Sequence, residues 1–155
     1  MTKLLYLAGP MSGIPKFNYP AFQEAAGVLR TRGFSVRNPA EMDSPEVQRA
    51  SMKCETGTFA ELYEKIGEPE HQCTWGDFLS EDVKLIADEV DAVALLPGWE
   101  NSRGARLEAF VAYSVQKEVY LYEDEELRSL SPMEGLLLIT HHTEGQGDVS
   151  RYNGG

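Results

Sequence analysis

The chain has 155 residues, of which 42% are hydrophobic and 25% charged, and its formal net charge is −11 at pH 7. This length and balance are typical of one soluble globular domain with a full hydrophobic core. Because the negative charge would repel nucleic acids and anionic membranes, we expect neither as a partner. No segment approaches the roughly 20 apolar residues that span a bilayer.

The two cysteines, Cys54 and Cys73, form neither a disulfide framework nor a Cys-x-x-Cys motif, and the N-terminus lacks the pattern of a signal peptide. These features predict a cytoplasmic protein. His71 stands near Cys73, but these candidates are too few for a structural zinc site, so we expect no metal. Neither a P-loop nor a Gly-x-Gly-x-x-Gly fingerprint is present, so no cofactor is expected.

The first predicted elements are a strand, a helix and a second strand. The apolar run Lys3–Ala8 predicts a buried strand, and the loop Gly9–Gly13 follows it. A helix is expected over Asn18–Thr31, with a proline in its first turn and a glycine after its end. Phe34–Arg37 predicts the second strand. Strands joined in this way form a right-handed βαβ unit, so the sheet is expected to be parallel.

Residues 40–74 are the least regular part of the sequence. Short helices are expected over Pro45–Met52 and Phe59–Ile66. Because the segment is polar, we expect an excursion near the functional site rather than a part of the core.

The remaining elements alternate between helices and strands. They are predicted as a helix, the central strand, a helix, a strand and a last helix, over Trp75–Glu89, Ala92–Leu96, Arg103–Lys117, Glu118–Tyr122 and Ser131–Thr140. The apolar positions of the first of these helices recur at near-helical spacing. The central strand is a short apolar run closed by Pro-Gly, which is typical of a strand covered on both faces.

This order predicts a single doubly wound α/β domain over residues 1–143, with a Rossmann-like or flavodoxin-like parallel sheet flanked by helices. The glycine-rich, polar tail 144–155 is expected to be mobile unless a neighbouring subunit holds it. Ligands of such folds bind at the carboxyl ends of the strands, where the loops 9–13, 38–41 and 98–104 would meet.

The start of the helix after the central strand is the clearest candidate for a binding site. Ser102 is a suitable N-cap, and Gly104 would let a ligand approach the backbone. Free N–H groups and the positive dipole end would favour a phosphate. One of Arg103 and Arg106 is expected to contact it. Glu108 lies one turn further and can point into the same crevice, although it could equally complement the helix dipole.

Asp82 and Glu108 are the candidate acid/base pair, because glycoside chemistry commonly uses two carboxyl groups. Taken alone, Asp82 would be a solvated charge on a helix face. Tyr6 could hydrogen-bond a carboxylate at the strand ends, or it could be a core aromatic. Trp99 could stack on a nucleobase, or it could cover the end of the sheet.

Three stretches in this order resemble the nucleoside 2-deoxyribosyltransferase superfamily: Tyr6–Gly13, Asp82 ahead of a buried strand, and Ser102–Glu108. The resemblance covers residues 1–37 and 75–123. It implies that Glu108 is the nucleophile that takes the deoxyribosyl group at C1′. It also implies that Asp82 assists protonation of the departing base, and that Tyr6 orients the nucleophile.

Within this superfamily, transferases tend to carry acidic residues just before the glycine of the Gly-x-x-x-Glu element. Ser102 and Arg103 stand there in this chain and resemble the phosphate loop of the 2′-deoxynucleoside 5′-phosphate N-hydrolases. Those hydrolases often have an arginine in place of Ser12, and they take a serine from the partner subunit, which Ser131 resembles. The resemblance therefore implies a homodimer or higher homo-oligomer. The expected substrate-binding residues are Gly9, Pro10, Met11, Ser12, Gly13, Trp99, Ser102, Arg103, Gly104 and Ser131.

The expected function is hydrolysis of the N-glycosidic bond of a 2′-deoxynucleoside 5′-monophosphate, giving free base and deoxyribose 5-phosphate through a covalent intermediate on Glu108. One alternative is a transferase that exchanges bases on nucleosides. Another is a catalytically silent nucleotide-binding module, such as a sensor. All three imply a small-molecule nucleotide or nucleoside as the partner.

Overall fold

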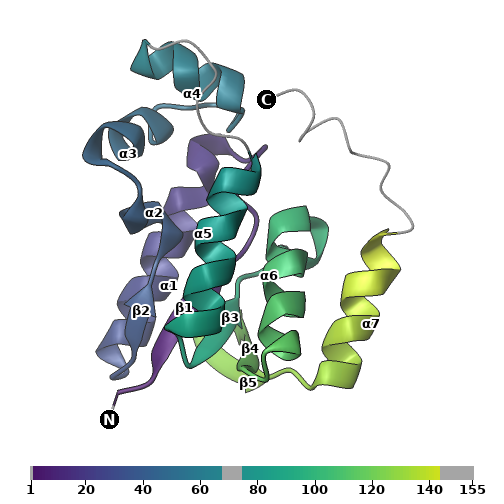
Figure 1. The fold of residues 1–155 in the computed structure, drawn as a ribbon. Helices are drawn as coiled ribbons and strands as arrows, with labels where there is room; N and C mark the ends of the chain where they lie inside the picture. The colour runs from purple at the N-terminus through teal and green to yellow at the C-terminus, as the bar shows by residue number, and fades with distance from the viewer. Residues whose placement is uncertain (1, 68–74, 144–155) are drawn as a thin grey trace.

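The computed structural model describes residues 2–67 and 75–143, which form a five-stranded sheet with helices on both faces (Figure 1). The strands are β1 (Leu4–Ala8), β2 (Ser35–Arg37), β3 (Ala92–Leu95), β4 (Glu118–Glu123) and β5 (Glu126–Ser129). The α-helices are α1 (Tyr19–Thr31), α2 (Pro39–Met42), α3 (Pro45–Ser51), α4 (Phe59–Ile66), α5 (Trp75–Asp88), α6 (Arg103–Ser114) and α7 (Pro132–Thr143). Two 3₁₀ turns, η1 (Pro15–Asn18) and η2 (Trp99–Asn101), precede α1 and α6. The predicted tail 144–155, His71 and Cys73 lie outside the described residues.

The sheet order β2-β1-β3-β4-β5 confirms the doubly wound α/β fold. The four predicted strands pair in parallel as expected, and a fifth strand that was not predicted, β5, pairs antiparallel with β4. The two strands are joined by Asp124 and Glu125, which both take positive φ values, 49° and 64°. Such hairpin turns usually contain glycine or asparagine, so the sequence carries little signal for this one.

The sheet separates two hydrophobic clusters. Alternate residues of β1 and β3 face opposite sides, so Leu5 and Ala94 pack with α1 while Tyr6 and Val93 pack with α5 and α6. Figure 1 shows α5 and α6 beside each other across this second face. The side chain of Tyr6 therefore lies on the same face of the sheet as the helices that carry Asp82 and Glu108.

The segment after β2 belongs to the core, contrary to the expectation of a polar excursion. Ala50, Cys54 and Leu62 are buried in the cluster on the α1 side of the sheet. A few apolar residues at helical spacing in α3 and α4 are enough to cover that end of α1. The Phe17 and Phe59 rings also contact, with centroids 5.7 Å apart.

In the part of the chain that the structure describes, no helix is both long and apolar enough to cross a membrane.

Candidate functional site

Tyr6 and Glu108 meet inside the molecule between β1 and α6. Tyr6 is the third residue of β1 and is only 1% exposed. Glu108 lies on the buried stripe of α6 together with small side chains, including Ala105 and Ala112, which let the helix approach the sheet closely. Its exposure is 7%. A carboxylate that only complemented the helix dipole would lie on the surface.

The Tyr6 hydroxyl is within hydrogen-bonding reach of the carboxylates of both Glu108 and Asp82. Oε2 of Glu108 is buried and has no hydrogen-bond partner among the described residues. A buried carboxylate oxygen without a partner is costly and rare in folded proteins. Such an orphan is typical of a group that is kept for a ligand or a reacting atom.

The surroundings raise the proton affinity of all three groups. Burial raises the pKa of Glu108 well above its usual range, the nearby Asp82 charge raises it further, and the Tyr6 hydrogen bond partly opposes both effects. Burial is also the main cause that raises the pKa of Asp82 to about 6. Burial and the two carboxylates raise the pKa of Tyr6, so its hydroxyl stays a donor. These are the properties of a coupled acid/base pair.

The first turn of α6 is built as expected for an N-cap. The Ser102 hydroxyl accepts a hydrogen bond from the Ala105 N–H at 3.2 Å. A Cβ placed on Gly104 would lie 3.9 Å from Oε1 of Glu108, so the carboxylate lies beside this turn. Arg106 donates to the carbonyl of Glu100 at 3.0 Å and braces the preceding 3₁₀ turn, whereas Arg103 is exposed at the start of the helix.

The loop after β1 packs closely against the loop after β3. A Cβ on Gly9 would lie 2.9 Å from Cβ of Leu96, and one on Gly98, whose φ is +86°, would lie 3.3 Å from Pro10. Gly9 is needed because any side chain there would be too close to Leu96, and Gly98 is needed because its φ is positive. Met11 packs against the core cluster on the α1 side, and Ser12 is half-buried.

The backbone N–H of Gly13, a predicted substrate-binding residue, is not free for a substrate. Its N–H donates to the carbonyl of Gly57 at 3.0 Å, so this donor is already used to fix the segment after β2. The side chain of Asn18 similarly donates to the Pro10 carbonyl at 2.9 Å and holds the loop from the other side.

Two predicted binding residues, Trp99 and Ser131, do not present their side chains to the site of the same chain. Trp99 is 3% exposed and packs in the core on the α5–α6 side, so it covers the sheet end and offers no free face to a base. Ser131 accepts a hydrogen bond from the Glu134 N–H at the start of α7. It follows Leu130, whose N–H bonds the carbonyl of Val119 near the beginning of β4. Ser131 is therefore at the amino end of the parallel strands, opposite the site.

A third carboxylate, Asp43, which was not predicted from the sequence, lies close enough to Asp82 to influence its pKa. It follows α2 and accepts a hydrogen bond from the hydroxyl of Tyr19, the first residue of α1. Its charge, together with that of the exposed Glu81, contributes to the raised pKa of Asp82. The available signal was positional, because the loop after β2 had to reach the carboxyl end of the sheet.

Within the described residues, no ion pair balances these carboxylates. Among residues 2–67 and 75–143, the ion pairs that form do not include Asp43, Asp82 or Glu108, and several link distant surface residues such as Lys3 and Glu118. Within the same residues, no group of three or more His, Cys, Asp or Glu side chains has the arrangement of a metal site. The described site can thus supply a buried nucleophile, an acid and hydrogen-bond acceptors.

The family model described as "Domain of unknown function (DUF4406)" matches residues 3–66 and 63–121. These residues include the strand that carries Tyr6, the helices that carry Asp82 and Glu108, and the segment that carries Asp43. Comparisons with curated proteins and with solved structures gave no match.

Proposed function

Because the chain belongs to the DUF4406 family, whose description assigns no activity, we propose its function from the site: hydrolysis of the N-glycosidic bond of a 2′-deoxynucleoside 5′-monophosphate. The observation that carries this proposal is the buried Glu108, whose Oε2 has no partner among the described residues and whose carboxylate is close to both Tyr6 and Asp82. A nucleophile beside an acid of pKa about 6 suits a leaving group that departs only when it is protonated.

The reaction proceeds in two steps. A Glu108 oxygen forms a bond to C1′ while the bond from C1′ to the base nitrogen breaks, and the electron pair of that bond takes the proton of Asp82. Water then attacks C1′ and gives a proton to the Asp82 carboxylate, and the ester bond breaks to restore Glu108. The products are the free base and deoxyribose 5-phosphate. The Tyr6 hydroxyl orients Glu108 and hydrogen-bonds its ionised form.

The 5′-phosphate would lie at the first turn of α6. This turn offers the helix N-terminus, the exposed Arg103 and the open backbone of Gly104 on the side of Glu108. A dianion there gains from the helix dipole and backbone N–H groups. The turn and the Glu108 carboxylate are adjacent, as a 5-phosphate and C1 of one pentose require.

A second candidate is base exchange on uncharged deoxynucleosides. The observation that favours it is the set of carboxylates Asp43, Glu81 and Asp82, which influence one another electrostatically and would repel a dianion placed among them. In this reaction, a second base takes the place of water in the attack on C1′.

The test is chromatography of the bases released from a panel of deoxynucleoside 5′-monophosphates and the matching deoxynucleosides. We expect release from the monophosphates, and a mass increase of one deoxyribosyl phosphate on wild-type protein quenched with acid. Glu108→Gln should show neither, and Asp88→Asn, an exposed change on α5, should show both. A new nucleoside formed after adding a second base would favour transfer. Nucleotide binding without any released base would contradict both reactions.

A further inference from the structure

Asp43 is a firmly held carboxylate that the proposed reaction does not use. The Tyr19 hydroxyl donates to its Oδ2, and Tyr19 is itself 2% exposed. Tyr19 also interacts with the hydroxyl of Ser51, which is 1% exposed. A buried serine and a buried tyrosine thus form a chain of hydrogen bonds that ends on one oxygen of Asp43. Such a chain fixes the direction of the carboxylate.

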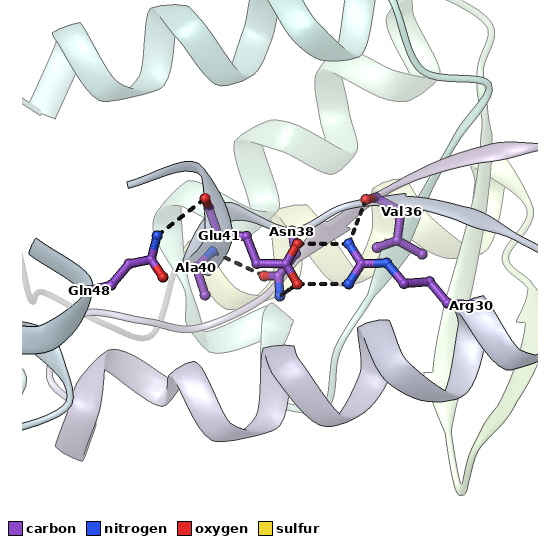
Figure 2. A network of polar contacts seen from close by, with 6 residues as sticks. All are labelled: Arg30, Val36, Asn38, Ala40, Glu41 and Gln48. Carbon is purple, nitrogen blue, oxygen red and sulfur yellow. Dashed lines mark hydrogen bonds and ion pairs between the residues drawn. The ribbon is translucent and has the colours of Figure 1, made fainter. Parts of the chain in front are cut away.

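The backbone that carries Asp43 is also fixed. The amide of Gln48 donates to the carbonyls of Asp43 at 2.7 Å and of Glu41 at 3.3 Å. Arg30 on α1 forms a two-pronged pair with Glu41, both contacts being 2.7 Å, and Asn38 caps α2 (Figure 2). This network connects α1, α2 and α3, and it leaves Asp43 little freedom to move.

Asp82 lies electrostatically between the other two carboxylates. The charge of Asp82 raises the pKa of Glu108, and the charge of Asp43 raises the pKa of Asp82. The strand order agrees, because Glu108 follows β3 and Asp43 follows β2, with β1 between these strands. If C1′ lay at Glu108 and the leaving base at Asp82, the base would extend from there toward the loop that carries Asp43.

We propose that Asp43 determines which base is accepted, by taking a hydrogen bond from an exocyclic amino group on the far edge of the base. This inference rests on the proposed function. Oδ2 is occupied by Tyr19, and among the described residues Oδ1 has no donor. An amino group supplies that donor, whereas a carbonyl in its place would turn lone pairs toward a carboxylate oxygen. Asp43 and Asp82 are both only partly buried, so a ligand can reach them from solvent.

The experiment compares substrates that differ only in an amino or an oxo group: deoxycytidine with deoxyuridine, and deoxyadenosine with deoxyinosine, each as nucleoside and 5′-monophosphate. For wild-type protein we expect kcat/KM at least tenfold higher for the amino member of each pair. Asp43→Asn, whose amide can donate to an oxo group, should lower this ratio at least tenfold or reverse it. Asp88→Asn should leave the ratio unchanged. Tyr19→Phe should weaken the preference, because Oδ2 of Asp43 loses its donor.

Binding separates failure of this inference from failure of the proposed function. Calorimetry of the same ligands with Glu108→Gln and with the Glu108→Gln, Asp43→Asn double variant measures the preference without turnover. If bases are released but both ratios are equal in wild type and Asp43→Asn, the inference on Asp43 is wrong and the proposed function stands. If no base is released, the proposed function is wrong, and the preference measured by binding decides whether Asp43 selects the base. Equal affinity for amino and oxo ligands in Glu108→Gln would overturn the role of Asp43.

Discussion

Asp82 on α5 and Glu108 on α6 bring two carboxylates to the hydroxyl of one buried tyrosine, Tyr6 in β1. Neither carboxylate takes part in an ion pair within the described residues. Burying unpaired carboxylates close together opposes folding, and a protein keeps such an arrangement where the chemistry needs it.

Asp82→Asn should increase the free energy of unfolding at alkaline pH and change it little near pH 4. The pKa of Asp82 is about 6 in the folded protein, above the ordinary value of 3.8, so the folded state binds this proton more tightly. The stabilisation that the protonated Asp82 gives to the folded state is therefore fully present below pH 4, and it is lost as the pH rises through 6. We expect a gain of roughly 1–3 kcal/mol at pH 8 from urea unfolding. Asp88→Asn is the control. An equal gain in unfolding free energy for Asp82→Asn at both pH values would show that the raised pKa of Asp82 is not the cause.

Base release should decrease above pH about 6, because Asp82 must carry the proton that the leaving base takes. Asp82→Asn should lose roughly 100-fold or more in kcat on ordinary bases and should lack this alkaline decrease. On a nitrophenyl 2-deoxyriboside, whose leaving group needs no proton, the same variant should lose far less. The pH profile of both substrates checks this. A similar loss on both substrates would place Asp82 in binding rather than proton transfer.

Tyr6→Phe should shift the acid side of the pH profile to higher pH. The Tyr6 hydrogen bond lowers the pKa of both Glu108 and Asp82, so without the hydroxyl Glu108 ionises at higher pH and Asp82 keeps its proton to higher pH. We expect roughly a 10–100-fold loss in kcat below neutral pH that is partly recovered at higher pH. A uniform loss at every pH would contradict this role, and thermal unfolding would show whether the fold itself had changed.

Gly104→Ala should reduce activity without reducing stability. The new methyl group would be 3.9 Å from Oε1 of Glu108, an ordinary contact that occupies the space proposed for substrate. Alanine also favours the helix, by up to about 1 kcal/mol. Gly27→Ala on α1 is the matched control, since nothing lies within 4 Å of its added Cβ. The control should gain stability and keep full activity. Unchanged activity in Gly104→Ala would argue against substrate at this turn.

Gly57→Ala should be severely destabilising, by roughly 3 kcal/mol or more. Its φ is +70°, and the added Cβ would lie 2.0 Å from the carbonyl oxygen of Ile14. Gly67→Ala separates the effect of the positive φ from that of the close contact, because Gly67 also has a positive φ, +81°, but no atom of the described residues lies within 4 Å of an added Cβ. It should cost about 1 kcal/mol. If chemical denaturation gave the same loss of unfolding free energy for Gly57→Ala and Gly67→Ala, the contact with Ile14 would relax easily.

The sequence by itself determined the local features of the fold. Short apolar runs closed by glycine and proline predicted β1 and β3, and helical spacing with suitable caps predicted α1, α5 and α6, each within a few residues of the observed bounds. The approach of Glu108 to the turn at Gly104 was also predictable, because residues one helical turn apart lie on the same face. These features depend on neighbours in the chain.

Only the tertiary structure decided which distant residues meet. It paired β5 antiparallel with β4, placed Leu62 in the core, and fixed Asp43 with a hydrogen bond from Tyr19. It also buried Trp99 and used the Gly13 N–H to hold Gly57, two outcomes for which the sequence left alternatives or pointed elsewhere. The physical reason is that periodicity and caps report the conformation of a segment, whereas contacts across a sheet end depend on strand order, register and the filling of space between helices.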